Sequence, residues 1–292
     1  MFLQKLKYLF RSILKITQTK RCPNCGATGV MEVDNKYLIT RLYKCSSCKL
    51  NFRFPVDSKQ FLIKFYQSEY QADYSEFTRE ITSLPTEEQL ANMTANNFRG
   101  KRDYSTFVAS LLKERTGKIL DYGCSWGYSI YQLKKAGFDT EGFEISKARA
   151  EFGKKIGVTI HSEETDVRNN NDLIMSSHAI EHLPVISEFI KFSKDKLNHD
   201  GIFMAFCPNG ADEYRKREPG VFHVNWGFLH PNYLDIEFAE TTFRRNPYLI
   251  MTGDWTYDLN ELALWDGQSQ VTGSRRDGQE LLIISKPNIY LA

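Results

Sequence analysis

The sequence predicts an α/β fold: a sheet with helices on both faces, preceded by a small cysteine-rich module and an N-terminal amphipathic helix. Three observations predict it. From residue 118 onward, apolar strand patterns alternate with helical patterns. Four cysteines form two C-x-x-C pairs, and the first 21 residues combine apolar and basic residues at helical spacing. The predicted boundaries are 1–21 for this helix, 22–55 for the cysteine module, 56–116 for a helical linker or lid, and 117–292 for the α/β domain.

The composition is that of a globular protein. Of 292 residues, 41% are hydrophobic and 25% charged, which excludes disordered and disulfide-dense classes. No window approaches eighteen uninterrupted apolar residues, and the apolar runs near the start are too short for a signal peptide. We therefore expect a cytoplasmic protein that neither spans a membrane nor is secreted.

The basic charge is concentrated at the N-terminus. Six Lys and Arg residues precede the first acidic residue, Glu32, so the rest of the chain carries 32 basic against 36 acidic residues, a net charge of −4. This balance argues against nucleic acid as a partner, since neutralising phosphates requires a basic face. An apolar stripe recurs at three- and four-residue steps among these basic residues: Phe2, Leu3, Leu6, Leu9, Phe10, Ile13 and Leu14. It predicts a helix that packs on the protein's own body or a second subunit, or that lies on the inner face of an anionic membrane.

The cysteine pairs predict a zinc ribbon. Cys22 and Cys25 are followed after nineteen residues by Cys45 and Cys48, and two residues between thiolates let each pair hold one side of a tetrahedral ion. A turn at Asp34-Asn35, between β-prone stretches, is predicted to bring the pairs together. Four thiolates leave no open coordination position, so the expected role of Zn²⁺ is structural. Disulfides are the alternative, disfavoured in a chain without a secretion signal.

Residues 56–116 read as three helices. Their patterns run from about Ser58 to Tyr70, from Thr86 to Phe98 and from Asp103 to Arg115. Thr86 with Gln89 forms a capping box, and Gly117 ends the last pattern.

A glycine-bearing turn at residues 121–127 predicts a nucleotide-type cofactor site. The apolar strand that begins at Lys118 leads into Asp121-Tyr-Gly-Cys-Ser-Trp-Gly127, and a helix starts near Gly127, which places backbone N–H groups beside a ligand. The next strand ends at Glu144, a carboxylate that can accept hydrogen bonds from both hydroxyls of a ribose. The spacing of Asp121, Gly123, Ser125 and Gly127 does not fit the G-x-G-x-x-G fingerprint of nicotinamide enzymes.

These residues resemble the class I S-adenosylmethionine-dependent methyltransferases, over about residues 117–210. The family motif D-x-G-x-G-x-G matches at Asp121, Gly123 and Gly127, with Ser125 where a second glycine is usual. The resemblance implies a Rossmann-like class I methyltransferase sheet, S-adenosylmethionine as cofactor, and Glu144 as the ribose acceptor. The turn after the fourth strand, His178 to Pro184, and Pro208-Asn209 after the fifth strand also look like family signatures. Glu163 and Glu164, after the third strand, are candidates for the adenine contact.

Two histidines are candidate general bases. In the resembling family the end of the fourth strand lies near the transferred methyl group, so His178 is the first candidate and His182 the second. Each is also explained as an ordinary turn or core residue. With Glu181 they match a metalloprotease pattern, H-x-x-E-H, but Pro184 follows at once and a strand precedes, so we interpret this match as coincidental.

The loop after the fifth strand predicts substrate contacts. Residues 221–231 are dense in aromatics and histidine, and loops at the carboxyl ends of parallel strands form pockets, so His223, Trp226 and His230 are candidate substrate-binding residues. A packed aromatic loop is the alternative. Further on, the segment 254–278 is expected to form a lid.

The order of ribbon and catalytic domain, with Phe65-Tyr66 and Tyr70, resembles enzymes of bacterial surface-glycan and secondary-metabolite pathways. It implies O- or N-methyl transfer to a sugar, glycan or related small molecule, the acceptor being lipid-linked if the N-terminal helix reaches a membrane. An RNA methyltransferase and a non-catalytic cofactor-fold binding protein are the alternatives. The net −4 charge argues against the first, and the intact motif with Glu144 argues against the second. The sequence predicts no oligomeric state.

Overall fold

The computed structural model describes residues 9–68, 83–96, 98–113 and 116–291. Its main sheet has eight strands in the order β11-β10-β12-β8-β7-β4-β5-β6. The central strands β6, β5, β4, β7 and β8 are parallel, β12 is antiparallel to β8 and β10, and β11 runs parallel to β10 at the edge. The bounds are β4 Lys118–Tyr122, β5 Asp139–Phe143, β6 Ile160–His161, β7 Asn171–Ser177, β8 Leu197–Pro208, β10 Tyr248–Gly253, β11 Gln270–Thr272 and β12 Glu280–Ser285. This sheet confirms the predicted Rossmann-like α/β fold.

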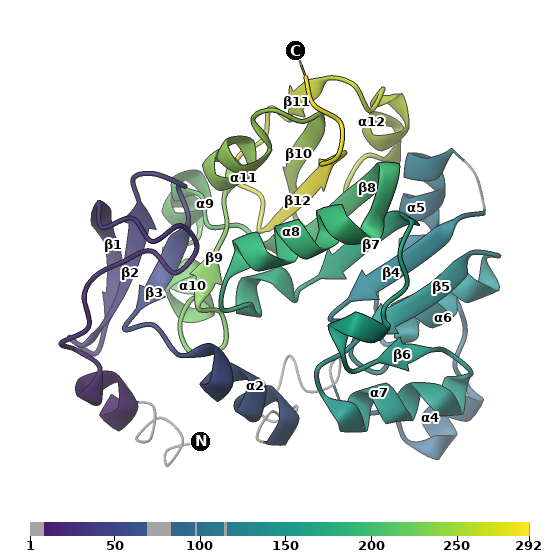
Figure 1. Cartoon of the computed structure of the whole chain (residues 1–292), viewed down its shortest axis with the longest axis horizontal. Coiled ribbons are helices and arrows are strands. Elements are labelled where there is room, and N and C mark those ends of the chain that lie inside the picture. The colour runs from purple at the N-terminus through teal and green to yellow at the C-terminus, as the bar shows by residue number, and fades with distance from the viewer. Residues whose placement is uncertain (1–8, 69–82, 97, 114–115, 292) are drawn as a thin grey trace.

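Helices cover both faces of the sheet (Figure 1). On one face, α8 (Ile186–Lys196) and α11 (Ile236–Phe243) bury Phe189 and Phe238 in a core that also contains residues of the cysteine module. On the other, α5 (Tyr104–Leu112), α6 (Tyr128–Lys135) and α12 (Leu259–Leu264) pack through side chains such as Phe107, Leu133 and Leu262. The remaining helices are α2 (Lys59–Ser68), α4 (Glu87–Ala91), α7 (Lys147–Gly153), α9 (Asp212–Arg217) and α10 (Pro219–Asn225).

Several predicted boundaries shift. The β7 strand has its predicted bounds, whereas β8 begins five residues before the expected Ile202. The Thr86–Gln89 capping box is present, but α4 ends at Ala91 because the cap at Asn92 closes the last turn. The ends predicted at Tyr70 and Arg115 lie outside the described residues.

The segment 254–278 is built into the sheet rather than forming a free lid. Its strand β11 pairs with β10, and its helix α12 packs on α5. Leu262 is 1% exposed, so this helix is fixed by the apolar side chains that it buries.

The cysteine module forms a second, antiparallel sheet in the order β1-β2-β3-β9 (Figure 1). Its bounds are β1 Val30–Lys36, β2 Thr40–Cys45, β3 Asn51–Phe54 and β9 Asn232–Tyr233. The turn predicted at Asp34-Asn35 is wrong: those residues lie in β1 and pair with β2, and the chain reverses at Tyr37 and Leu38, both with positive φ. Strand β9 follows α10, so the small sheet is completed by a segment of the main α/β domain.

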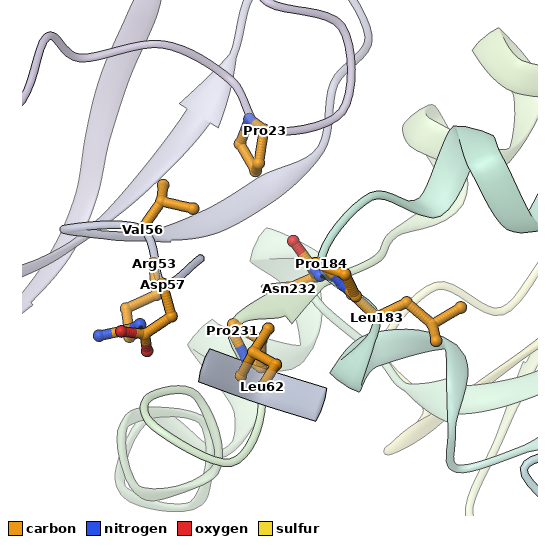
Figure 2. Close-up of a pocket in the computed structure, with 9 residues that line it drawn as sticks. All are labelled: Pro23, Arg53, Val56, Asp57, Leu62, Leu183, Pro184, Pro231 and Asn232. Carbon is orange, nitrogen blue, oxygen red and sulfur yellow. Dashed lines mark hydrogen bonds and ion pairs between the residues drawn. The ribbon is translucent and has the colours of Figure 1, made fainter. Parts of the chain in front are cut away.

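Hydrogen bonds join the ribbon to the main domain near the turn after β7. The Arg53 backbone N–H donates to the Pro231 carbonyl at 2.7 Å, and the Asn232 side-chain amide donates to the Leu183 carbonyl at 2.6 Å. Figure 2 shows the small pocket at this junction, which is lined by Arg53 and Asp57 from the ribbon side and by Leu183 and Asn232 from later segments of the chain. Because of these hydrogen bonds, a shift of the ribbon would also move the turn after β7.

Residues 9–14 of the N-terminal segment are helical. Their basic side chains face the body: Arg11 and Lys15 each form a salt bridge with the buried Asp57 at 3.1 Å. The stripe residues Phe10 and Leu14 are 60% and 83% exposed. The stripe residues Phe2, Leu3 and Leu6 lie outside the described residues. Packing of the stripe on the protein's own body, on a second subunit or on a membrane therefore stays a prediction. No helix in the described part of the chain has both the length and the apolarity needed to cross a bilayer.

Candidate active site

The turn after β4 has the backbone shape that the glycine motif predicts. Gly123 and Gly127 have φ of +81° and +91°, a backbone conformation that residues with a side chain rarely adopt. A Cβ on Gly123 would lie 2.4 Å from the Ala179 Cβ, and one on Gly127 would lie 2.8 Å from Val158 and Ile160 atoms. Strand order reverses at β4, so this turn lies where open α/β sheets bind ligands.

Ser125, at the usual position of the second glycine, also adopts the left-handed conformation, with a φ of +55°. The Arg149 guanidinium on α7 donates to the Ser125 Oγ at 2.6 Å. This bond holds the serine in a conformation that only glycine adopts freely. Arg149 could not be predicted from the sequence, because nothing local relates it to a turn 24 residues earlier.

Glu144 follows β5 and accepts two backbone hydrogen bonds. The N–H groups of Ser125 and Ser146 donate to its two carboxylate oxygens at 2.9 and 2.8 Å. Burial raises the pKa of Glu144, and these bonds and Arg149 oppose the shift. A carboxylate has about four lone-pair positions, so a bound ligand's hydroxyls could still find acceptors here.

Asp121, at the end of β4, is buried and accepts a hydrogen bond from the Ser129 hydroxyl. Burial raises its pKa to about 7, although Ser129 and Lys101 lower it. Burial also lowers the pKa of Lys101 to about 8. Asp121 therefore acts mainly within the turn, where its bond to Ser129 ties β4 to α6. Of the adenine candidates, Glu164 accepts from the Tyr122 hydroxyl at 2.5 Å, and Glu163 is exposed; the adenine contact stays a prediction.

His178 follows β7 with a φ of +52° and lies among charged partners from distant segments. Its Nε2 is 2.7 Å from Glu280 Oε1, and its ring stacks on Trp255 with centroids 5.2 Å apart. Burial lowers the pKa of His178, but Glu181 and Glu280 outweigh this and raise it to about 9. It is therefore protonated at neutral pH, and its predicted role as a base would first require that proton to leave. Glu280, on β12, also forms a salt bridge with Arg102 at 2.6 Å. The sequence predicted a functional role for neither Glu280 nor Arg102.

A second group gathers around Glu181 in the single helical turn Ile180–His182. Glu181 is fully buried, and ligand atoms of Glu181, His182 and His230 lie within 4.8 Å of one another. Burial raises the pKa of Glu181, but the neighbouring histidines lower it to about 2. Burial and His182 lower the pKa of His230 to about 4. His230, a predicted substrate contact, thus lies beside His182, the second candidate base.

The other two predicted substrate residues lie against the ribbon. His223 Nδ1 and Trp226 Nε1 both lie 2.8 Å from Asp34 Oδ2 on β1, and Trp226 is 1% exposed. The Lys36 ammonium lies over the Trp226 ring. These contacts fix α10 to the ribbon, so a substrate role for His223 and Trp226 stays a prediction without support from their placement.

The four predicted zinc ligands converge at the base of the ribbon. Cys22 Sγ lies 3.5 Å from Cys48 Sγ, and Cys25 Sγ lies 3.6 Å from Cys45 Sγ. A disulfide would need about 2.05 Å, whereas thiolates on a tetrahedral zinc with Zn–S bonds of about 2.3 Å lie about 3.8 Å apart. Gly26 and Lys49, each just after the second cysteine of its pair, both have positive φ, so the two turns are alike. The thiols are free and their arrangement fits a tetrahedral ion.

Comparison with known proteins decides the family. A family model described as a methyltransferase domain matches residues 93–259, more than half of the chain. The chain belongs to the methyltransferase domain family. This methyltransferase chain has no match among curated proteins.

Solved structures with a similar arrangement are distant in sequence. An S-adenosylmethionine-dependent methyltransferase from Thermotoga maritima is 18% identical, with a TM-score of 0.41, covering 62% of this chain and 87% of its own. A TehB-like methyltransferase from Corynebacterium glutamicum is 19% identical, with a TM-score of 0.40 and coverage of 68% and 96%. The plantazolicin methyltransferase bound to S-adenosylhomocysteine is 12% identical, with a TM-score of 0.47 and coverage of 77% and 93%.

Proposed function

We propose that the protein transfers a methyl group from S-adenosylmethionine to a hydroxyl or amine of a sugar, glycan or related small molecule, in surface-polysaccharide or secondary-metabolite synthesis. The observation that carries the donor assignment is the convergence of the Gly123–Gly127 turn with Glu144 at the switch point of the sheet. Membership of the methyltransferase family supports the reaction class.

The donor side is built to receive a nucleoside with an amino-acid tail. The absence of a side chain at Gly123 lets Ala179 pack against the turn, and Glu144 is held in place by two N–H groups, ready to accept from ribose hydroxyls. When bound, S-adenosylmethionine supplies an electrophilic methyl group on a sulfonium. No side chain is needed to activate the methyl, so the chain's task is positioning.

The acceptor side supports a polar small molecule. Ala179 packs against Gly123, so the segment after β7 lies beside the donor turn. Hydrogen-bonding side chains gather in this region, namely His178 and His182 from that segment and Glu280, which bonds to His178. The His178–Glu280 pair can hold or release a proton near an acceptor hydroxyl or amine. The net charge of −4 outside residues 1–21 weighs against an RNA acceptor.

A structural Zn²⁺ in the ribbon is part of the proposal. The Cys22, Cys25, Cys45 and Cys48 thiols would hold it with no open position, stabilising a four-stranded sheet too small to hold itself.

Peripheral membrane contact through residues 1–21 would suit a lipid-linked acceptor. The exposed Phe10 and Leu14 support it. Co-sedimentation with anionic liposomes should be stronger for the full chain than for a chain starting at Lys20, and equal binding would reject the contact.

Calorimetric titration with S-adenosylhomocysteine tests the donor site. We expect saturable binding, weakened at least tenfold in Glu144→Gln, because the variant loses a charged acceptor for two hydroxyls. Glu151→Gln, on an exposed carboxylate of α7 that pairs with Lys154, is the matched control and should bind normally. Failure to bind, or preferential binding of NADH, would reject the methyltransferase proposal.

Transfer of a labelled methyl group tests the acceptor. The zinc-loaded protein is incubated with labelled S-adenosylmethionine and a panel of nucleotide sugars, lipid-linked sugars, amino sugars and RNA. We expect label in a sugar compound, and label in RNA alone would contradict the acceptor class.

A further inference from the structure

The group formed by Glu181, His182 and His230 has a feature that a packed core does not explain. The turn Ile180–His182 and the loop after α10 are far apart in sequence, yet one carboxylate and two imidazoles from them meet with ligand atoms within 4.8 Å. The two histidine rings lie 4.9 Å apart between centroids. Glu181 is buried, whereas both histidines are half-buried, so one side of the group is open.

Backbone contacts fix the same tautomer on both histidines. His182 Nδ1 lies against the Leu229 carbonyl, and His230 Nδ1 lies 2.7 Å from the Asn225 carbonyl. A carbonyl oxygen accepts only, so each Nδ1 carries the proton and each neutral ring keeps its lone pair on Nε2. Metal-binding histidines show this same arrangement, in which the second ring nitrogen donates to a carbonyl and orients the ligand.

Glu181 supplies an anion that the protein leaves without a hydrogen-bond donor. Its side chain is 0% exposed, and neither carboxylate oxygen has a hydrogen-bond partner in the described residues. The protonated His178 balances part of this charge with its Nδ1 3.6 Å from Oε1, and the neutral His182 has its Nε2 3.8 Å from Oε1; neither is within hydrogen-bond distance. A buried carboxylate without donors is costly unless a cation binds directly to it.

We propose that Glu181, His182 and His230 bind a divalent transition-metal ion, distinct from the ribbon zinc, through one carboxylate oxygen and two imidazole Nε2 atoms. Two nitrogens and one oxygen suit Zn²⁺, Fe²⁺ or Co²⁺ better than Mg²⁺ or Ca²⁺, which prefer oxygen ligands. At bond lengths of about 2.0–2.2 Å, neighbouring donor atoms lie about 3.0–3.6 Å apart, so small rotations of the two histidines would close the site.

Three protein ligands leave at least one coordination position for water or a ligand oxygen. His178, which follows β7, lies 3.6 Å from the Glu181 carboxylate, so a ligand on the ion would lie near the acceptor side of the proposed active site. Metal binding by these three residues does not depend on the identity of the methyl donor or acceptor.

Metal content of the full-length protein tests the site. The protein is equilibrated with excess Zn²⁺, desalted, and analysed for zinc per chain. We expect two zinc ions in the wild type and one in His230→Gln and in His182→Gln. His223→Gln is the matched control: it lies in the same segment, contacts Asp34 instead, and should keep two ions.

A spectroscopic readout keeps the test informative if a variant folds poorly. Wild-type protein with zinc retained in the ribbon is titrated with Co²⁺; we expect weak ligand-field bands without thiolate charge transfer, since the new ligands are nitrogen and oxygen. One zinc ion in the wild type, two ions retained in folded His230→Gln, or thiolate bands for the added Co²⁺ would overturn the site. Because no methyl donor is present, failure here leaves the proposed methyl transfer untouched.

Discussion

The donor and acceptor sides of the proposed active site are built in opposite ways. The donor side is one continuous stretch, residues 118–146, held by backbone contacts such as the Ser125 and Ser146 N–H bonds to Glu144. The acceptor side is assembled from separate segments by charged side chains, with His178 and Glu280 102 residues apart. The fold of the donor side should therefore tolerate side-chain changes that leave its backbone intact, whereas the structure of the acceptor side should depend on each charge and on the ribbon behind it.

The largest expected effect comes from the ribbon. Cys45→Ser removes a fully buried ligand, and zinc binding supplies on the order of 10 kcal/mol to small metal modules. We expect loss of ribbon zinc, a much lower Tm, and a larger loss of methyl transfer than of S-adenosylhomocysteine binding, because β9 follows His230 directly. Metal analysis, thermal unfolding and calorimetry measure these.

Cys207→Ser, an equally buried thiol outside the cluster, is the control for Cys45→Ser. It should retain its zinc. Equal losses of transfer and of donor binding in Cys45→Ser would contradict the view that the ribbon supports the acceptor side in particular.

The next effect tests the charges of the acceptor side. Glu280→Gln leaves Arg102 and His178 without their buried anion, and breaking a buried ion pair costs about 3–5 kcal/mol. Glu188→Gln, which removes an exposed partner of Lys59, should cost less than about 1 kcal/mol. Urea unfolding compares the two variants, and similar small losses would show that the buried pairs contribute little.

A third prediction concerns the point where the two sides touch. Gly123→Ala places a methyl 2.4 Å from the Ala179 Cβ at a positive φ, so we expect a loss of about 3 kcal/mol and weaker S-adenosylhomocysteine binding. Gly157→Ala also has a positive φ but meets no atom within 4 Å, and it should cost only about 1 kcal/mol. Equal losses in both would assign the effect to backbone strain alone.

The smallest effect is a pH dependence on the donor side. The pKa of Asp121 is raised to about 7 in the folded protein from 3.8, so the folded state holds a proton that the unfolded chain has lost. Stability should fall as pH rises, by about 1.4 kcal/mol per pH unit, or about 2 kcal/mol between pH 5 and 6.5. Asp121→Asn should remove this part of the slope. Unfolding titrations that show the same slope in both proteins would contradict the buried, protonated Asp121.

This contrast explains how far the sequence could predict the molecule. The strands of the sheet, the cluster of four cysteines and the glycine turn after β4 follow from short-range patterns, since Gly123, Gly127 and Glu144 lie within a single β-α-β unit. Arg149 escaped prediction because its contact with Ser125 depends on how α7 packs.

The acceptor side could not be predicted, because its residues meet only through tertiary packing. Glu280 and Trp255 reach His178 from the last third of the chain, and Arg102 of the linker reaches Glu280; no spacing relates these residues. His230 was selected for its aromatic surroundings, yet its placement beside Glu181 depends on how β9 joins the ribbon. Trp226 in the same loop turned toward Asp34 instead.

A crystal structure of the full-length, zinc-loaded protein with S-adenosylhomocysteine tests the central claim most directly. We predict the ligand at the turn after β4, with its ribose hydroxyls within hydrogen-bond distance of Glu144 and its amino-acid end beside Gly123. A ligand bound elsewhere, or a ribose that does not contact Glu144, would contradict the account of the donor side.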